Sequence, residues 1–524
     1  MATTSYSAPS DWFDAHHSQQ RATLYWRLWF ATILGITGIT AYFMLAIMPV
    51  PLPIGGIIFF GTVALFWHQP RYGLYMIVTL ALVGDATLLP WYPFVKNFSS
   101  AESLLYLHSA IIFSPLELYM VLILTLWLGK GAMARRLIWH TGELFWPTIG
   151  FTLFLVLGLI YGLATGGNAN IALWEVRPIF YIPVLLILTT NFLNTYQDVN
   201  RLIWLIMIAL FIEGLVGSYH YFVVLGMNIA SVQRITEHSA AIHMNTFFVL
   251  ILATWLYQGS TWKRVVLPML APAVLLTYIA TQRRAAFLSL GIALILLAIL
   301  LYQQNRKRFW QIVPIVALVA AAYIGAFWHS NGALGLPAQA VKSIIAPQEN
   351  SADTLSNLYR MIENVNINHT IRLSPLTGVG FGNKFHIIVQ MPDISFFVWW
   401  EYIVHNSIFW IWMKTGVLGF MSMLFLVSYS ILTGARLVAQ MPNGDLRAIT
   451  LTATLYIVMH FLYAYVDMSW DNQSMIYVGT MLGIINSAER IKAQSRTQPV
   501  KQRPWELHSA SRSLAVSGFN KGSI

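Results

Sequence analysis

Residues 285–302 read AAFLSLGIALILLAILLY and contain no charged side chain. A helix needs about 20 predominantly apolar residues to cross the hydrocarbon core of a bilayer. The length and composition of this run therefore predict a helix that crosses a membrane.

Apolar segments of similar length recur along the whole chain. With the first one they number about fourteen, and two short neighbours, 50–67 and 70–86, would also fit one re-entrant unit. We therefore expect an all-α, polytopic transmembrane helix bundle of about 12–14 spans. The other segments lie near residues 25–46, 114–130, 144–163, 173–191, 202–226, 239–258, 264–281, 309–328, 406–433, 447–466 and 473–488.

The composition supports lipid as the surrounding solvent. The chain of 524 residues is 57% hydrophobic and only 10% charged, whereas soluble domains carry about 25% charged residues. Its net charge of +11 is distributed in short clusters beside apolar segments, so it does not indicate nucleic-acid binding. Cysteine is absent, which excludes disulfides, thiol catalysis and Cys-ligated metals.

The distribution of Lys and Arg predicts the topology. If the N-terminus is cytoplasmic, 21 of the 31 Lys and Arg residues fall in inner segments, as the positive-inside rule requires. Residues 1–20 lack an apolar signal-peptide core, so we expect the first span to direct insertion. The expected parts are a cytoplasmic N-terminus (1–24), transmembrane helices (25–328), a large outer loop (329–404), transmembrane helices (405–489) and a cytoplasmic basic tail (490–524).

His405 and Asn406 lie at the outer start of a predicted span. A neutral imidazole at the membrane surface can take a proton from a hydroxyl group, which makes His405 a candidate general base. The alternative is that His405 and Asn406 cap the helix and contact headgroups. Lys414 lies about 13.5 Å deeper, at 1.5 Å per residue.

Several arginines are predicted on the outer side, against the usual topology signal. Adjacent Arg283 and Arg284 have guanidinium forks that suit a diphosphate, although arginines at this depth also reach lipid headgroups. Arg234 is a further phosphate candidate, and the alternative is an ion pair with Glu237. His238 and His243 are poorly spaced for a metal on a helix, so we expect no metal site.

The large outer loop contains a predicted amphipathic helix, Asp353–Asn366, followed by a glycine-rich run at 374–382. Arg360 and Glu363 on that helix suit either glycan contacts or an intrahelical pair. Glu175 and Arg177, also on the outer side, suggest an ion pair. Asp467 and Asp471 lie in the last outer loop. For these two aspartates, simple solvation is favoured over binding of a sugar or a cation.

These motifs together resemble the bacterial O-antigen ligase and O-antigen polymerase superfamily. His405-Asn406, nine residues, then Gly416-Val417-Leu418-Gly419 matches its His-[Asn/Ser/Gln]-x9-Gly-x-x-Gly pattern. The run Ser374-Pro375-Leu376-Thr377-Gly378-Val379-Gly380-Phe381-Gly382 looks like its Pro-x-x-Gly-x-Gly-x-Gly stretch.

The arginines extend the resemblance over roughly residues 230–430. Arg284 stands where the family has the arginine of a Ser-Arg-Gly-Ala motif, and Arg234 where it has a further outer arginine. Arg283 replaces the usual serine, which leaves the register between the two adjacent arginines open.

The resemblance implies a helix bundle of the lipid-dependent glycosyltransferase type, without a cofactor. Its donor would be a glycan on undecaprenyl pyrophosphate, its acceptor a glycan or a lipid-linked glycan, and its site would face the periplasm of the bacterial inner membrane. Polysaccharide-assembly proteins are expected partners. The implied roles are His405 as catalytic base, Arg284, Arg283 and Arg234 at the pyrophosphate, and Arg360, Glu363, Gly378, Gly380, Gly382 and Asn406 in glycan or loop contacts.

Three activities remain open at this point. We favour polymerisation or transfer of lipid-linked oligosaccharide in exopolysaccharide or O-antigen biosynthesis. A ligase that acts on lipid A-core shares the same motifs. A transporter or flippase of lipid-linked glycans is the alternative of another class, and Lys414 near the membrane midplane favours it.

Overall fold

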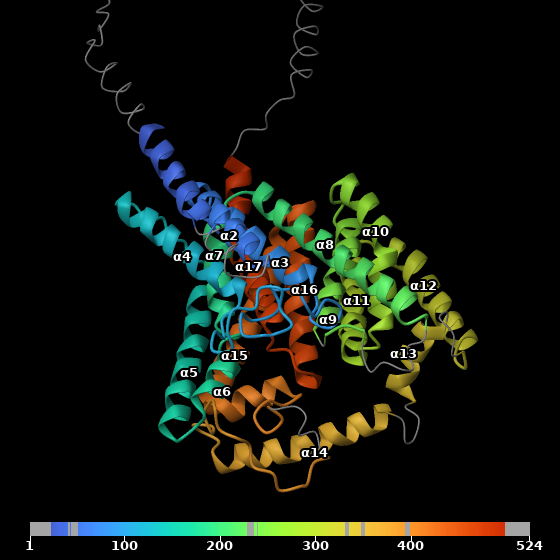
Figure 1. The fold of residues 1–524 in the computed structure, drawn as a ribbon. Helices are drawn as coiled ribbons and strands as arrows, with labels where there is room; N and C mark the ends of the chain where they lie inside the picture. The colour runs from blue at the N-terminus through green and yellow to red at the C-terminus, as the bar shows by residue number, and fades with distance from the viewer. Residues whose placement is uncertain are drawn as a thin grey trace, which may run out of the picture.

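The computed structural model describes residues 23–39, 42, 51–227, 235–237, 239–330, 335–346, 352–392 and 399–497. All regular elements in these ranges are helices, and no strand occurs in them. The predicted all-α transmembrane helix bundle is therefore confirmed (Figure 1).

Nine helical segments in the described ranges are long and apolar enough to cross a membrane. Shorter apolar helices are α2 (Pro51–His68), α3 (Arg71–Val83) and α9 (Ala240–Leu256), and α17 (Asn472–Thr497) and residues 23–39 are helical as well. Each predicted apolar segment overlaps one of these helices. The nine are α4 (Pro115–Met133), α5 (Phe145–Ala164), α6 with α7 (Ala169–Phe192), α8 with η1 (Tyr196–Val224), α10 (Thr261–Ala280), α11 (Arg284–Gln304), α12 (Arg306–Ala326), α15 (Ser407–Gln440) and α16 (Asp445–Val466).

The predicted span 173–191 differs from the observed helices. It is divided into α6 (Ala169–Val176) and α7 (Tyr181–Phe192), with Pro178 in the turn between them. Proline has no amide hydrogen to donate within a helix and its ring crowds the preceding turn, so the helix is interrupted there. The interruption brings Glu175 and Arg177 to the end of the bundle at which the candidate site lies.

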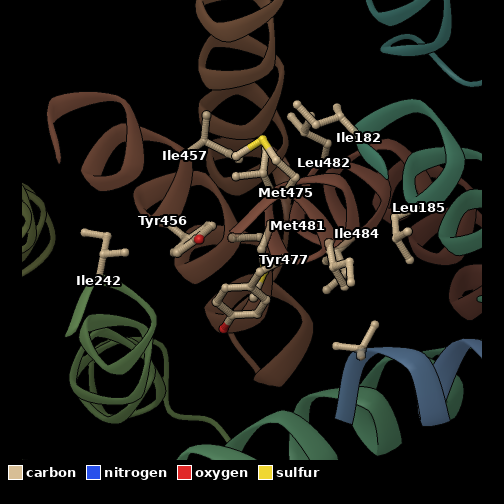
Figure 2. Packing of buried hydrophobic residues seen from close by; sticks show 14 of the residues in the cluster. Ile182, Leu185, Ile242, Tyr456, Ile457, Met475, Tyr477, Met481, Leu482 and Ile484 are labelled. Carbon is tan, nitrogen blue, oxygen red and sulfur yellow. The ribbon is translucent and has the colours of Figure 1, made fainter. Parts of the chain in front are cut away.

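The centre of the bundle is formed by the C-terminal helices. α17 packs against α7 and α16, and α16 also contacts α9 and α15. Figure 2 shows this core, in which the rings of Tyr456 and Tyr477 lie 4.5 Å apart. Gly479 and Gly483 of α17 face α7 so closely that a Cβ atom would meet Ile182 or Thr189 at 2.8 Å or less. Small residues of this kind allow the close helix contacts that stabilise membrane bundles.

α14 (Ala352–Leu373) lies across one end of the bundle, which we call the α14 end (Figure 1). Residues 23–39 and the C-terminal end of α17 lie at the opposite end. α14 extends beyond the predicted helix 353–366 because its last turns are tied to the following loop. Asn366 accepts hydrogen bonds from the amides of Ile388 and Val389, and Thr370 accepts one from His386.

Candidate active site

His405 lies at the α14 end, immediately before α15, and contacts Glu363 of α14. The Glu363 carboxylate accepts a hydrogen bond from the His405 amide at 2.9 Å, and His405 Nδ1 lies 3.2 Å from both carboxylate oxygens. The Glu363 side chain is almost fully buried, whereas that of His405 is 26% exposed. Glu363 therefore fixes the orientation of the ring, and the His405 side chain remains partly accessible.

Tyr359 completes the surroundings of the His405 ring. It stands one helical turn before Glu363, and its ring meets that of His405 edge-on at 5.4 Å. Burial and the adjacent Glu363 charge raise the pKa of Tyr359, so its hydroxyl remains protonated. The sequence motifs did not single out this residue, although its i, i+4 spacing to Glu363 places both on one face of a helix.

Asn406 has the capping role that was considered for the His405-Asn406 pair. Its Oδ1 accepts a hydrogen bond from the Phe409 amide at the start of α15, and its Nδ2 donates to Asn364 of α14. The cap ties α15 to α14 next to the His405–Glu363 contact. The capping interpretation therefore holds for Asn406, whereas the His405 side chain contacts Glu363 instead.

Arg283 and Arg360 approach the same carboxylate. Arg283 Nη1 lies 3.9 Å and Arg360 Nη2 lies 3.8 Å from Asp467 Oδ2, and the Asp467 side chain is only 3% exposed. Tyr463 also donates a hydrogen bond to this oxygen. The interpretation of Asp467 as a solvated residue is therefore wrong, because its carboxylate joins two guanidinium groups from α14 and from the turn before α11.

Arg360 and Glu363 do not pair along their helix. Arg360 faces Asp467 on the loop after α16, and Glu363 faces His405. The i, i+3 spacing allowed an intrahelical pair, but each side chain has a partner of opposite charge on another element. α14 thus supplies one carboxylate to the histidine and one guanidinium to the arginine cluster.

The two adjacent arginines have different environments. Arg283 precedes α11 and faces Asp467, whereas Arg284 donates a hydrogen bond from Nη2 to Asn357 of α14 at 3.1 Å. Arg284 therefore contacts α14 directly, and Arg283 contacts the aspartate that Arg360 of α14 also approaches. Arg234 and His238 lie outside the described residues.

Asp471 is half-buried and is bound to a helix rather than simply solvated. It precedes α17 and accepts hydrogen bonds from the amide and hydroxyl of Ser474. The solvation prediction is wrong here as well, because the carboxylate caps a helix within the bundle. Burial raises the pKa of Asp471.

The glycine-rich run is packed between α5, α6 and α15. Gly378, Gly380 and Gly382 are buried and all have positive φ, as does Gly416 of α15. A Cβ atom on Gly380 would lie 2.3 Å from Gly162 Cα of α5. On Gly416 it would lie 1.9 Å from the Leu376 carbonyl oxygen. Only glycine allows both this backbone conformation and this contact distance.

Lys414 and Glu175 form a fully buried ion pair beneath the glycine-rich run. Lys414 Nζ lies 2.7 Å from Glu175 Oε1, and both side chains are 0% exposed. Lys414 also donates to the Asn383 carbonyl oxygen, and the Gly382 amide donates to the other oxygen of Glu175. This pair therefore connects α6, α15 and the loop. The buried partner explains how a lysine is accommodated so deep in a predicted span.

Glu175 and Arg177 do not form the outer pair that their spacing suggested. Arg177 Nε lies 3.0 Å from Glu117 of α4, and its guanidinium group covers the Trp174 ring at 4.6 Å. Arg177 also donates to the Ile112 carbonyl oxygen. Its contacts are those of a structural residue that holds the segment before α4.

Comparison with known families supports the resemblance that the motifs indicated. The family model described as O-antigen ligase matches residues 270–424. The resemblance to the O-antigen ligase and polymerase superfamily is confirmed. The matched O-antigen ligase segment contains Arg283, Arg284, α14, the glycine-rich run and His405, whereas Asp467 lies beyond it. A search of the curated proteins found no match.

Proposed function

We propose that this protein is a membrane glycosyltransferase that transfers or polymerises oligosaccharide linked to undecaprenyl pyrophosphate. The observation that carries the proposal is the contact between His405 and Glu363 at the same end of the bundle as the arginines around Asp467. A base and a group of phosphate-binding cations are the two requirements of a transfer from a diphosphate donor.

The proposed reaction is a single displacement. An acceptor hydroxyl oxygen attacks the anomeric carbon of the donor, and the bond between that carbon and the pyrophosphate oxygen breaks. With Nδ1 directed to Glu363, Nε2 of His405 takes the hydroxyl proton. One displacement inverts the configuration at the anomeric carbon.

The arginines stabilise the leaving group in this scheme. The undecaprenyl pyrophosphate gains negative charge as the glycosidic bond breaks, and guanidinium groups bind such charge through paired hydrogen bonds. Asp467 offsets part of the positive charge of Arg283 and Arg360 before the donor binds. The diphosphate of the donor then binds these two guanidinium groups. Arg284 and Arg234 are assigned to the same diphosphate.

The α14 end faces the periplasm of the bacterial inner membrane in this proposal, and both chain ends are cytoplasmic. The helix of residues 23–39 and the C-terminal end of α17 lie away from α14, which supports this orientation (Figure 1). A site on that face requires a donor that is already in the membrane, as a lipid-linked glycan is. The assembly proteins of the same polysaccharide are the proposed partners.

Polymerisation in exopolysaccharide or O-antigen biosynthesis is our first assignment, and ligation to lipid A-core is the second. The O-antigen ligase match supports the second equally well at the level of chemistry. Deletion of the gene separates them. A polymerase mutant accumulates single lipid-linked repeats, whereas a ligase mutant accumulates full-length lipid-linked chains.

A transporter is less well supported than an enzyme. Lys414 was the residue that favoured a midplane substrate site, but it is occupied by Glu175 and the Asn383 carbonyl oxygen. The arginines and His405 lie at the α14 end instead, as expected for chemistry at one membrane surface.

The proposal is tested with purified protein in nanodiscs and a lipid-pyrophosphate-linked oligosaccharide. We expect His405→Ala and Arg284→Ala to lose transfer activity. His369→Ala and Arg372→Ala serve as matched controls, because they remove the same two residue types at other positions, on α14. Full activity in correctly inserted His405→Ala and Arg284→Ala proteins would overturn the proposal.

A further inference from the structure

A cavity of about 380 Å³ lies beside the candidate active site. Ile403 and Val404, which precede His405, line it together with Ser407, and so does Met468, which follows Asp467. The same two chain segments thus carry the histidine, the aspartate of the arginine cluster and one wall of the cavity. Its volume lies within the range of small-molecule binding sites.

Four tryptophans form much of the cavity wall. Trp174 and Trp399 lie with their ring centres 5.2 Å apart, and the Arg177 guanidinium group lies over the Trp174 ring. The indole N–H groups of Trp410 and Trp470 donate to the carbonyl oxygens of Tyr402 and Ser407. These contacts fix the rings before any ligand arrives, so the cavity presents rigid aromatic faces.

The polar part of the lining is acidic. Glu237 and Asp471 contribute carboxylates, and Asn472 and Gln473 contribute amides, whereas the carboxylate of the lining residue Glu175 is paired with Lys414. None of the described lining residues is a lysine, an arginine or a histidine. A carboxylate offers about four lone-pair sites, so the bonds from Ser474 to Asp471 leave capacity for further donors.

We infer that this tryptophan-lined cavity binds an uncharged sugar residue of the transferred or accepting glycan. A pyranose ring has an apolar C–H face that stacks on indole and hydroxyl edges that donate hydrogen bonds to carboxylates and amides. A phosphate or a uronic acid would instead meet carboxylates of the same charge. The inference rests on the proposed function for the source of the sugar but not for the binding itself.

Binding is tested without turnover in the His405→Ala protein. The probes are chitotriose and cellotriose, which are neutral, and trigalacturonate, which is anionic, with saturation-transfer NMR as the readout. We expect the neutral probes to bind and trigalacturonate not to bind. In the same background, Trp399→Leu should weaken neutral binding about 10-fold, or about 1.4 kcal/mol.

Three further variants make the result decisive. Trp262→Leu changes a tryptophan that is 68% exposed on α10 and should leave probe binding unchanged. Trp399→Phe retains an aromatic face and should bind the neutral probes even if Trp399→Leu fails to fold. Asp471→Asn keeps a helix-capping side chain but removes one of the lining carboxylates, so it should reduce the preference for the neutral probes over trigalacturonate.

The transfer assay with the Trp399→Leu variant in an otherwise active protein identifies which substrate supplies the sugar, and it distinguishes failure of this inference from failure of the proposed function. A raised KM for the acceptor assigns the cavity to the acceptor glycan, and a raised KM for the donor assigns it to the donor glycan. Neutral probes that do not bind, or that bind Trp399→Leu as well as the parent, overturn the inference even if transfer is observed. Trp399→Leu that reduces binding of a spin-labelled phospholipid but not of sugar identifies a lipid site instead. Sugar binding in a protein without any transfer activity supports the cavity and contradicts the proposed function.

Discussion

His405 and Glu363 are 42 residues apart in sequence, yet the Glu363 carboxylate contacts both the backbone amide and Nδ1 of His405. A carboxylate at Nδ1 holds the proton on that nitrogen and directs the lone pair of Nε2 outward. The arrangement therefore supplies orientation as well as charge. It depends on α14, since Glu363 belongs to the helix that covers this end of the bundle.

Glu363→Gln should lower kcat for transfer by roughly 100-fold and change the KM values little, because loss of an orienting carboxylate impairs a histidine base by factors of about 10² to 10⁴. Steady-state kinetics with varied donor and acceptor check this. Glu401→Gln, which alters a carboxylate paired with the exposed Lys384, is the control. A rise in KM with unchanged kcat would show instead that Glu363 binds a substrate.

Arg283 and Arg360 should act as one unit, because both approach the same oxygen of Asp467. Each single change to Ala should reduce kcat/KM by about 10² to 10³, the loss typical of one donor to a developing anion. The double variant should lose less than the product of the two, which a double-mutant cycle measures. Strictly multiplicative losses would mean that the two guanidinium groups bind separate parts of the substrate.

The elements of the fold followed from simple patterns, whereas their ends required tertiary contacts. The run 285–302 identified α11 because the bilayer fixes the length of a span. The interruption at Pro178 and the extension of α14 to Leu373 were not predicted. The extension depends on neighbours that are distant in sequence, such as the loop amides bound by Asn366. The interruption has a local cause, a proline inside an apolar run that is long enough to be read as one span.

The candidate site was predicted only in part for the same reason. Arg283 and Arg360 were identified because positive charges on the outer side are unusual and costly near a membrane. His405 was identified from its motif, and Glu363 from its place beside Arg360 in the loop helix. Asp467 was misjudged, since nothing local distinguishes a solvated aspartate from one that two arginines approach from other elements. Tyr359 was missed because an aromatic residue on an amphipathic helix is ordinary until its partner is known.

The protein should become less stable as the pH rises from about 4 to about 6. Burial raises the pKa of Asp85, in the segment after α3, from 3.8 to about 6. Between these values Asp85 binds more protons in the folded state than in the unfolded state, so its contribution to stability falls with rising pH and levels off above about 6. The full effect is on the order of 3 kcal/mol for a shift of this size.

Thermal unfolding midpoints in detergent at several pH values check the role of Asp85. Asp85→Asn should flatten the dependence, since an amide cannot ionise and its oxygen still accepts hydrogen bonds from Thr87, Leu88 or Glu237. Glu489→Gln, a change at an exposed carboxylate, should leave the slope unchanged. A slope that survives in Asp85→Asn would assign the dependence to other carboxylates.

Removal of one partner of the Lys414–Glu175 pair should destabilise the protein, whereas replacement of both partners by uncharged residues should destabilise it less. Lys414→Met leaves a carboxylate unpaired at 0% exposure, and loss of one partner of a buried pair costs about 3–5 kcal/mol. Glu175→Gln in addition should recover much of the lost thermal stability, because the amide oxygen can still accept from the Gly382 amide. Equal midpoints for the single and double variants would contradict the pairing.

Gly162 on α5 should be indispensable for the packing of the glycine-rich run. Its Cβ position lies 2.1 Å from the carbonyl oxygen of Phe381 and 2.5 Å from its amide nitrogen, and backbone atoms cannot move aside as a flexible side chain can. Gly162→Ala should therefore displace the run, lower the unfolding midpoint and reduce transfer about 100-fold or more, as misplaced active-site segments do. Gly150→Ala is the matched control on the same helix, because no atom lies within 4 Å of its Cβ position. Alanine there should be neutral or stabilising by about 0.5–1 kcal/mol. Wild-type activity in Gly162→Ala would show that contact between the run and α5 is not needed for transfer.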